Sequence, residues 1–158
     1  KQMPSDMRLS PHFTLQEMTK SQTALRFNID NTPNAEQVKS LKALCENVLE
    51  PCRKHFKRAF VPSSGFRSKA LCKAIGSSAK SQHAKGEAAD FEIRTVANID
   101  LAKWIRDNLE FDQLILEFYD GIDPNSGWVH VSYRADGNNR KQCLSYDGKR
   151  YVSGLDEA

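Results

Sequence analysis

The stretch "SQHAKGEAADFEI", from Ser81 to Ile93, places an imidazole shortly before a predicted buried strand and a carboxylate within that strand. His83 and Asp90 lie seven positions apart, with small residues between them. The apolar residues from 88 to 93 are typical of a buried strand. The small and polar residues 77–86 before it predict a loop. The stretch therefore predicts an imidazole and a carboxylate held close together.

The chain upstream of this stretch is predicted to be mostly helical. Thr14 and Glu17 have the spacing of a capping box, which predicts the start of a helix. A longer amphipathic segment runs from Ala35 to about Phe56, and Pro51 should kink or break that helix near its end. The pattern further predicts a loop over 28–34, a short strand leading into a turn over 59–68, and a helix over 69–75.

The chain downstream is predicted to be mostly strands. The pattern predicts a helix over 99–109, strands over 112–119 and 128–134, and a terminal hairpin that turns on Asp147-Gly148. We therefore expect one α+β domain over residues 1–158, with N-terminal helices packed on a mainly antiparallel sheet.

Composition and charge exclude several classes of protein. The 39% hydrophobic and 27% charged residues are ordinary for a globular domain. A net charge of +3 is too small to indicate nucleic-acid binding. No apolar run approaches the roughly 20 residues that span a bilayer, and residues 1–10 contain no apolar segment typical of a secretion signal. We expect a monomer without a membrane span.

The four cysteines do not have the spacing of a metal site. Cys45, Cys52, Cys72 and Cys143 form no paired C-x-x-C motif. A zinc site built from them is the alternative, but we expect buried free thiols in a reducing compartment.

Strand periodicity adds a second histidine and a second carboxylate to the candidate site. In "WVHVSY", His130 points away from the face that carries the two valines. In "DQLILEFY", Glu117 points away from the face of Leu114 and Leu116. If the two strands are antiparallel neighbours with their aliphatic faces in one core, Glu117 and His130 face the same cleft.

These side chains have the composition of a catalytic zinc site. Two imidazoles and one carboxylate, with a fourth position left for water, are the usual ligands of catalytic zinc. His83, Asp90 and His130 supply that set, and Glu117 could take the proton of an activated water. Arg67, which follows a glycine in "SSGFRS", could hold a substrate carbonyl or carboxylate.

Each candidate also has a simpler interpretation. His83 could be an ordinary loop histidine, Asp90 a cap for backbone amides at a strand edge, and His130 a hydrogen-bonded core residue. Arg67 could form a surface ion pair, for example with Glu87 or Glu92, and Glu117 could be a solvated strand carboxylate. Glu92 shares the face of Asp90 and is the second candidate for the base.

Three separated motifs resemble one family of enzymes. "SGFRS", "SQHAKGEAADF" and "WVHVSY" resemble the zinc peptidases that cut bacterial cell-wall peptides. These are the D-Ala-D-Ala carboxypeptidases, the D-Ala-D-Ala dipeptidases and the phage L-Ala-D-Glu endopeptidases, which share their fold with the hedgehog signalling domain. The matched positions are Ser81, His83, Gly86, Ala88, Asp90, Trp128 and His130. The opening "LSPHFTLQEM" is similar to a common start in the phage and bacterial branch, so the resemblance covers most of the chain.

The resemblance implies a role for each matched residue. His83, Asp90 and His130 would bind zinc, Arg67 would polarise the scissile carbonyl or bind substrate, and Ser81 would line the substrate site. Many members carry the catalytic Glu three residues before the last His, and this chain has Gly127 there. Glu117 on the preceding predicted strand is the expected substitute.

The expected function is zinc-dependent hydrolysis of peptidoglycan stem peptides that contain D-amino acids. The alternative is a non-catalytic module of the same fold that keeps zinc for binding or as part of a virion. Since no secretion signal is visible, we expect a phage-encoded protein in the host cytoplasm or the virion, with a bacterial enzyme as the second choice.

Overall fold

A computed structural model describes residues 7–155 of the chain, so the two ends of the predicted 1–158 domain lie outside the described residues. The helices are α1 (Leu15–Thr19), α2 (Gln22–Arg26), α3 (Ala35–Leu44), η1 (Cys45–Leu49), α4 (Glu50–Phe56), α5 (Lys69–Ala74), η2 (Gln82–Lys85) and α6 (Asn98–Asn108). The strands are β1 (Arg8–Ser10), β2 (Phe13–Thr14), β3 (Ala88–Phe91), β4 (Gln113–Glu117), β5 (Trp128–Ser132), β6 (Gln142–Tyr146) and β7 (Tyr151–Ser153). The predicted α+β fold, with helices before the sheet, is confirmed.

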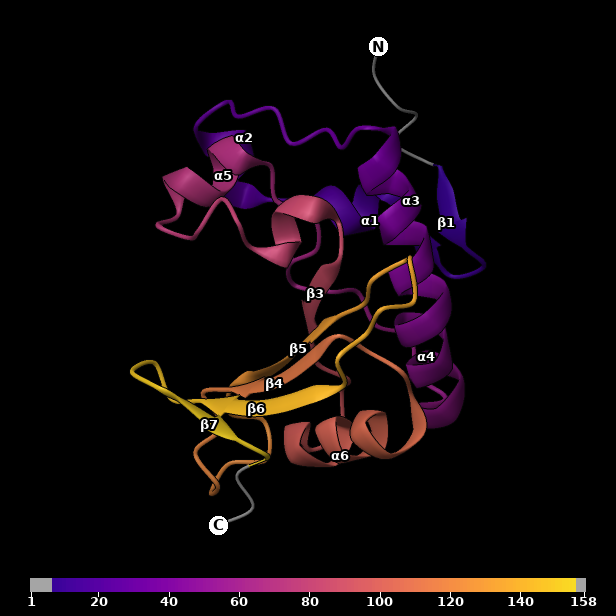
Figure 1. Ribbon diagram of the computed structural model, residues 1–158, viewed down its shortest axis with the longest axis vertical. Coiled ribbons are helices and arrows are strands. Elements are labelled where there is room, and N and C mark those ends of the chain that lie inside the picture. The colour runs from indigo at the N-terminus through magenta and orange to yellow at the C-terminus, as the bar shows by residue number, and fades with distance from the viewer. Residues whose placement is uncertain (1–6, 156–158) are drawn as a thin grey trace.

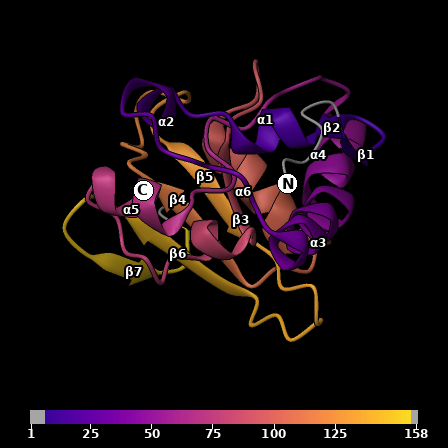
Figure 2. The same cartoon turned by 90° about the horizontal axis from the view of Figure 1, so that it is seen from above.

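The main sheet has the strand order β3-β5-β4-β6-β7. Three of its four pairs are antiparallel, as expected, and the pair β4–β6 is parallel. In Figure 1, α6 lies beneath the sheet, while η2 and α5 lie on the other side of it. Figure 2 shows α3 and α4 at one side of the molecule and β7 at the opposite side. The sheet therefore has one face covered by α6 and one face turned toward η2.

One hydrophobic core joins the helices to the covered face of the sheet. The side chains of Leu114, Leu116, Val129 and Val131 are buried on that face. They belong to one cluster with residues of α3, η1, α4 and α6. Because side chains alternate along a strand, the opposite face of β4 and β5 presents Ile115, Glu117, Trp128, His130 and Ser132.

The long predicted helix spans the expected residues, but Pro51 does not break it. Helical structure runs without interruption from Ala35 to Phe56, and residues 45–49 form a π-helical turn that ends two residues before Pro51. Pro51 lacks a backbone N–H, so a regular helix would leave one carbonyl of the preceding turn unpaired. The wider turn changes the pairing at this point, and the helix continues.

The predicted strand within residues 59–68 is not formed. This segment makes one isolated antiparallel bridge, between Ser64 and Asp90 on the edge of β3. Pro62 cannot donate to a ladder, which limits pairing along the segment. Phe60 instead stacks on Phe91, with ring centroids 5.0 Å apart.

Other local predictions are confirmed or refined. Thr14 and Glu17 form both bonds of the capping box at α1. The terminal hairpin forms between β6 and β7. The predicted loop over 77–86 contains one short helix, η2. Within residues 7–155, no helix combines the length and the apolar character needed to cross a bilayer.

Candidate metal centre

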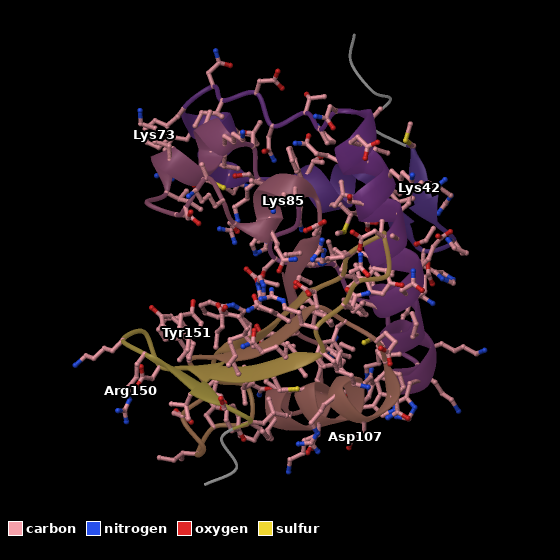
Figure 3. All side chains as sticks on the ribbon, viewed as in Figure 1. Lys42, Lys73, Lys85, Asp107, Arg150 and Tyr151 are labelled. Atoms are coloured by element: carbon pink, nitrogen blue, oxygen red, sulfur yellow. The ribbon has the colours of Figure 1, made fainter. Side chains whose placement is uncertain are left out.

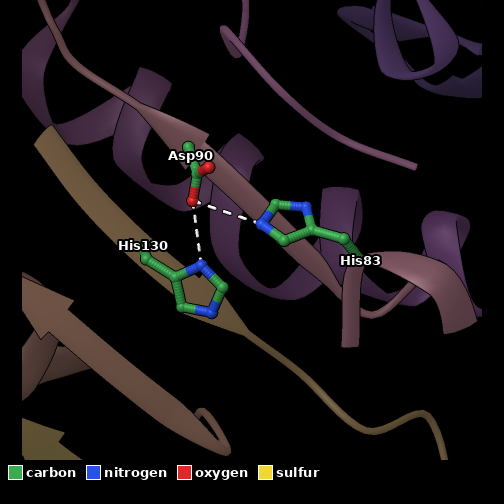
Figure 4. A group of neighbouring side chains, drawn as sticks. All are labelled: His83, Asp90 and His130. Atoms are coloured by element: carbon green, nitrogen blue, oxygen red, sulfur yellow. Dashed lines mark hydrogen bonds and ion pairs between the residues drawn. The ribbon is translucent and has the colours of Figure 1, made fainter. Parts of the chain in front are cut away.

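Three donor side chains from different elements converge on the open face of the sheet. His83 comes from η2, Asp90 from β3 and His130 from β5. Asp90 and His130 are direct partners in the antiparallel pair of β3 and β5. One donor atom from each of the three residues lies within 4.8 Å of the other two. Figure 4 shows the three side chains pointing toward one another. A search of the described residues for three or more neighbouring histidine, cysteine, aspartate or glutamate side chains that could hold a metal ion finds this group.

The short turn around His83 follows from the sequence of the motif. Ser81 caps η2, since its hydroxyl oxygen accepts a hydrogen bond from the backbone N–H of His83 at 3.1 Å. Gly86 ends the turn with φ +74. A Cβ atom on Gly86 would lie 2.5 Å from the carbonyl oxygen of Gln37. Both the positive φ and this close backbone approach therefore require glycine at position 86. The turn therefore holds His83 rigidly against the start of β3.

The hydrogen bonds of His83 leave one ring nitrogen available for a cation. Its Nδ1 lies 2.7 Å from the carbonyl oxygen of Gly65. Because a carbonyl only accepts, Nδ1 carries the proton. Burial lowers the pKa of His83 and so favours the neutral ring. The lone pair of Nε2 then faces Oδ1 of Asp90 at 3.3 Å, an arrangement of two acceptors that a cation between them would stabilise.

Asp90 is the residue on which the cluster converges. Burial alone would raise its pKa, but the hydrogen bond with His130 leads the interactions that outweigh burial and hold the pKa below its ordinary value. Its Oδ1 lies 2.8 Å from Nδ1 of His130. Its Oδ2 accepts a hydrogen bond from Nη2 of Arg67 at 3.1 Å. The carboxylate is therefore ionised, with one oxygen directed at both imidazoles.

Arg67 is fixed beside the cluster by two contacts. Its Nε donates to the hydroxyl of Ser64 at 2.8 Å, and its Nη2 donates to Asp90. The sequence left open a surface ion pair of Arg67 with Glu87 or Glu92. The ion pair of Arg67 is instead with Asp90. A guanidinium has five N–H donors, so Arg67 keeps donors for a substrate oxygen.

Glu117 lies in the next row of the same sheet face. Ile115 of β4 is the direct partner of His130, and Glu117 is the direct partner of Trp128. The antiparallel pairing that places Glu117 on the face of His130 is therefore confirmed. Burial raises the pKa of Glu117, and the charge of Asp90 adds to this effect, while His130 opposes it. A carboxylate with a raised pKa is suited to accepting and releasing a proton.

Gly127 cannot carry the side chain that its position would need. Its φ is +65, and a Cβ atom there would lie 1.9 Å from the carbonyl oxygen of Glu117. The second candidate base, Glu92, lies outside the cleft. Its Oε1 accepts a hydrogen bond from Nδ2 of Asn98 at 3.0 Å. Glu117 is thus the candidate base that the structure brings beside the three donors.

A cleft of about 680 Å³ surrounds the cluster. Its lining includes Arg67, Ser81 and Glu117 together with the three donors. Figure 3 labels Lys85 on the η2 side and Tyr151 on the β7 side, and both line the cleft. The four cysteines lie outside it, and three of them are buried as expected.

Sequence reasoning missed other residues in the cleft wall: Gln82, Asp112, Arg134, Arg140 and Tyr151. Strand parity could have found Arg134, which is four residues after His130 and so continues the same face. Asp112 and Arg140 come together only through tertiary contacts between separate loops.

The match to a known family extends across these elements. No curated protein matches the chain by sequence. A family model described as Peptidase M15 matches residues 11–132, a range that contains the three donors, Arg67 and Glu117. That range is most of the chain, and the zinc dependence of this family agrees with a histidine-rich donor set in an open cleft. The chain therefore belongs to the peptidase M15 family of zinc metallopeptidases.

Proposed function

We propose that this metallopeptidase hydrolyses bacterial peptidoglycan peptides that contain D-amino acids. The observation that carries the proposal is the convergence of His83, Asp90 and His130 in one cleft, with Glu117 in the adjacent row of the sheet. Two nitrogens and one oxygen suit zinc and leave a position for water. The motifs that resemble cell-wall peptidases contain all three donors, which supports the substrate class.

The three donors would hold zinc through Nε2 of His83, Oδ1 of Asp90 and Nδ1 of His130. Bound zinc supplies Lewis acidity, which polarises a carbonyl and lowers the pKa of water. The carbonyl of Gly65 fixes the ring of His83, and Arg67 fixes the carboxylate of Asp90. These outer contacts orient the donors before the ion arrives.

Glu117 is proposed to move the proton during hydrolysis. It accepts the proton of the attacking water and then delivers it to the leaving amine. Its raised pKa, caused first by burial, favours both halves of this task. Arg67 is proposed to donate an N–H to the oxygen of the scissile carbonyl, where negative charge develops. Ser81, which lines the cleft, is proposed to contact the substrate.

Zinc content and substrate cleavage test the proposal together. Elemental analysis of the purified protein should find one zinc per chain, and His83→Ala should lose it. Cys52→Ser is the matched control, because Cys52 is buried in the helical core away from the cleft. Mass spectrometry of digested peptidoglycan should then show hydrolysed stem peptides. Zinc that is retained in His83→Ala but lost in Cys52→Ser would contradict the assignment.

The role of Glu117 separates an enzyme from a binding module. Glu117→Gln should fold and bind zinc but lose turnover by roughly a hundred- to ten-thousand-fold. Glu92→Gln is its control, since Glu92 lies outside the cleft and should keep wild-type turnover. If wild type binds zinc and wall peptides but cleaves none of them, the chain is a non-catalytic module of this fold.

A further inference from the structure

The cleft differs chemically at its two ends along the strands. The donors lie at the middle of the strands, where His130 of β5 pairs with Asp90 of β3 on one side and with Ile115 of β4 on the other. Glu117 and Tyr151 lie toward one end. Arg134 and Arg140 lie toward the other end, beyond the C-terminus of β5 and before the N-terminus of β6. One end therefore carries Glu117 and an aromatic ring, and the other carries two guanidinium groups together with the carboxylates of Glu87 and Asp112.

A buried carboxylate fixes the position of Arg140. Asp112 is 1% exposed and accepts hydrogen bonds from Nε of Arg140 at 3.0 Å and from Nη2 at 2.8 Å. It also accepts from Nε2 of Gln82 at 3.0 Å, so the same carboxylate connects the sheet to the turn that carries His83. A bidentate pair of this kind holds a guanidinium in one orientation.

Arg140 keeps unused donors on the cleft side. Its side chain is 56% exposed although Asp112 binds one edge of it. Across residues 7–155, no hydrogen bond from its Nη1 is formed. Arg134 makes one ion pair, with the exposed Asp136 at 3.2 Å. Both arginines can therefore donate hydrogen bonds to a carboxylate without breaking a buried interaction.

The position of this end relative to the donors sets where a carboxylate would bind. Asp112 lies directly before β4 and precedes Ile115 by three residues, which corresponds to roughly 10 Å of extended chain. That distance equals about three residues of an extended peptide. Glu117 lies on the opposite side of the donor row, and the leaving amine must lie near Glu117 to receive its proton. The acyl part of the substrate then extends toward Arg140.

We propose that Arg140, held by Asp112 and assisted by Arg134, binds a substrate carboxylate about two to three residues before the scissile bond. This inference rests on the proposed function and adds a preference to it. A D-Ala-D-Ala bond preceded by an acidic residue meets the requirement. An L-Ala-D-Glu bond does not, because its acidic residue supplies the amine and lies on the leaving side.

Binding of two matched peptides tests the inference without turnover. Both peptides end in D-Ala-D-Ala and differ only at the residue two places before the scissile bond, which carries either a free carboxylate or its carboxamide. Calorimetry with the zinc-loaded Glu117→Gln protein should show on the order of tenfold tighter binding of the carboxylate peptide. Arg140→Gln in the same background should remove that difference. Arg150→Gln, which changes an arginine outside the cleft, should retain it.

Further variants separate recognition from a structural role of Arg140. Arg134→Gln removes only a surface pair, so it should fold and weaken binding of the carboxylate peptide alone. Equal binding of the two peptides by the parent protein, failure of both to bind, or a preference that survives both substitutions would overturn the inference. The proposed function is judged separately by zinc content and peptidoglycan digestion, so a failure of the carboxylate preference can be distinguished from a failure of the proposed function.

Discussion

Replacing Gly127 by alanine should destabilise the protein more than a comparable substitution elsewhere. Gly127 has φ +65, where an L-residue costs roughly 1–2 kcal/mol. The added Cβ would also lie 1.9 Å from the carbonyl oxygen of Glu117 and 2.6 Å from the carbonyl carbon of Phe118. Both atoms are backbone and cannot turn aside, so the overlap adds about 1–3 kcal/mol. The expected loss in the free energy of unfolding is about 2–5 kcal/mol.

Gly137→Ala provides the matched control for this measurement. Gly137 has φ +82, but a Cβ atom there would meet no heavy atom within 4 Å. It should lose only the conformational part, roughly 1–2 kcal/mol. Urea unfolding of both variants, with wild type alongside, measures the two losses. Equal losses would refute the steric argument, as would recovery of activity when Gly127→Glu is combined with Glu117→Gln.

Three further predictions concern the cleft. Removing zinc with a chelator should lower the melting temperature, and added zinc should restore it, because a ligand of the folded state stabilises by about 2.7 kcal/mol at a hundred times its Kd. A melting temperature that is unchanged by the chelator and by added zinc would contradict the metal site. Arg67→Lys should keep zinc but lower turnover, since lysine lacks the guanidinium fork that bonds both Ser64 and Asp90; unchanged turnover would assign Arg67 a structural role. Hydrogen bonds from Arg140 lower the pKa of Asp112 from 3.8 to about 2. Its stabilisation is therefore complete above about pH 4 and is lost as the pH falls toward 2, by about 1 kcal/mol for a half-exposed partner. Asp112→Asn should reduce that acid-dependent loss in urea titrations, and an unchanged acid profile would contradict the pairing.

Much of the site could be predicted because its geometry is local. A period of two residues along β5 places His130 opposite the two valines that enter the core. The turn between Ser81 and Gly86 is fixed by a side-chain cap and by a glycine, and both residues can be recognised in the sequence. Where short-range rules decide the direction of a side chain, the sequence is sufficient.

The remaining features depend on contacts between distant segments. The parallel pair of β4 and β6 joins strands that are separated by β5 in the chain, and no local pattern indicates it. Asp112 and Arg140 are 28 residues apart, and they meet at irregular strand ends, where parity gives no direction. Tertiary packing decides each of these.

The position of the candidate base shows how strand parity constrains chemistry. Residue 127 is an odd number of positions before His130, so a regular strand would turn its side chain toward the core. The residue directly opposite Trp128 on β4 is Glu117, and Trp128 is an even number of positions from His130. A carboxylate on β4 therefore faces the donors without any distortion of β5. The close approach of Gly127 to the carbonyl of Glu117 lies next to the same pair, because Gly127 directly precedes Trp128. One strand register thus fits both the glycine at 127 and the proposed base Glu117, because β4 supplies a carboxylate on the face of the donors that position 127 does not.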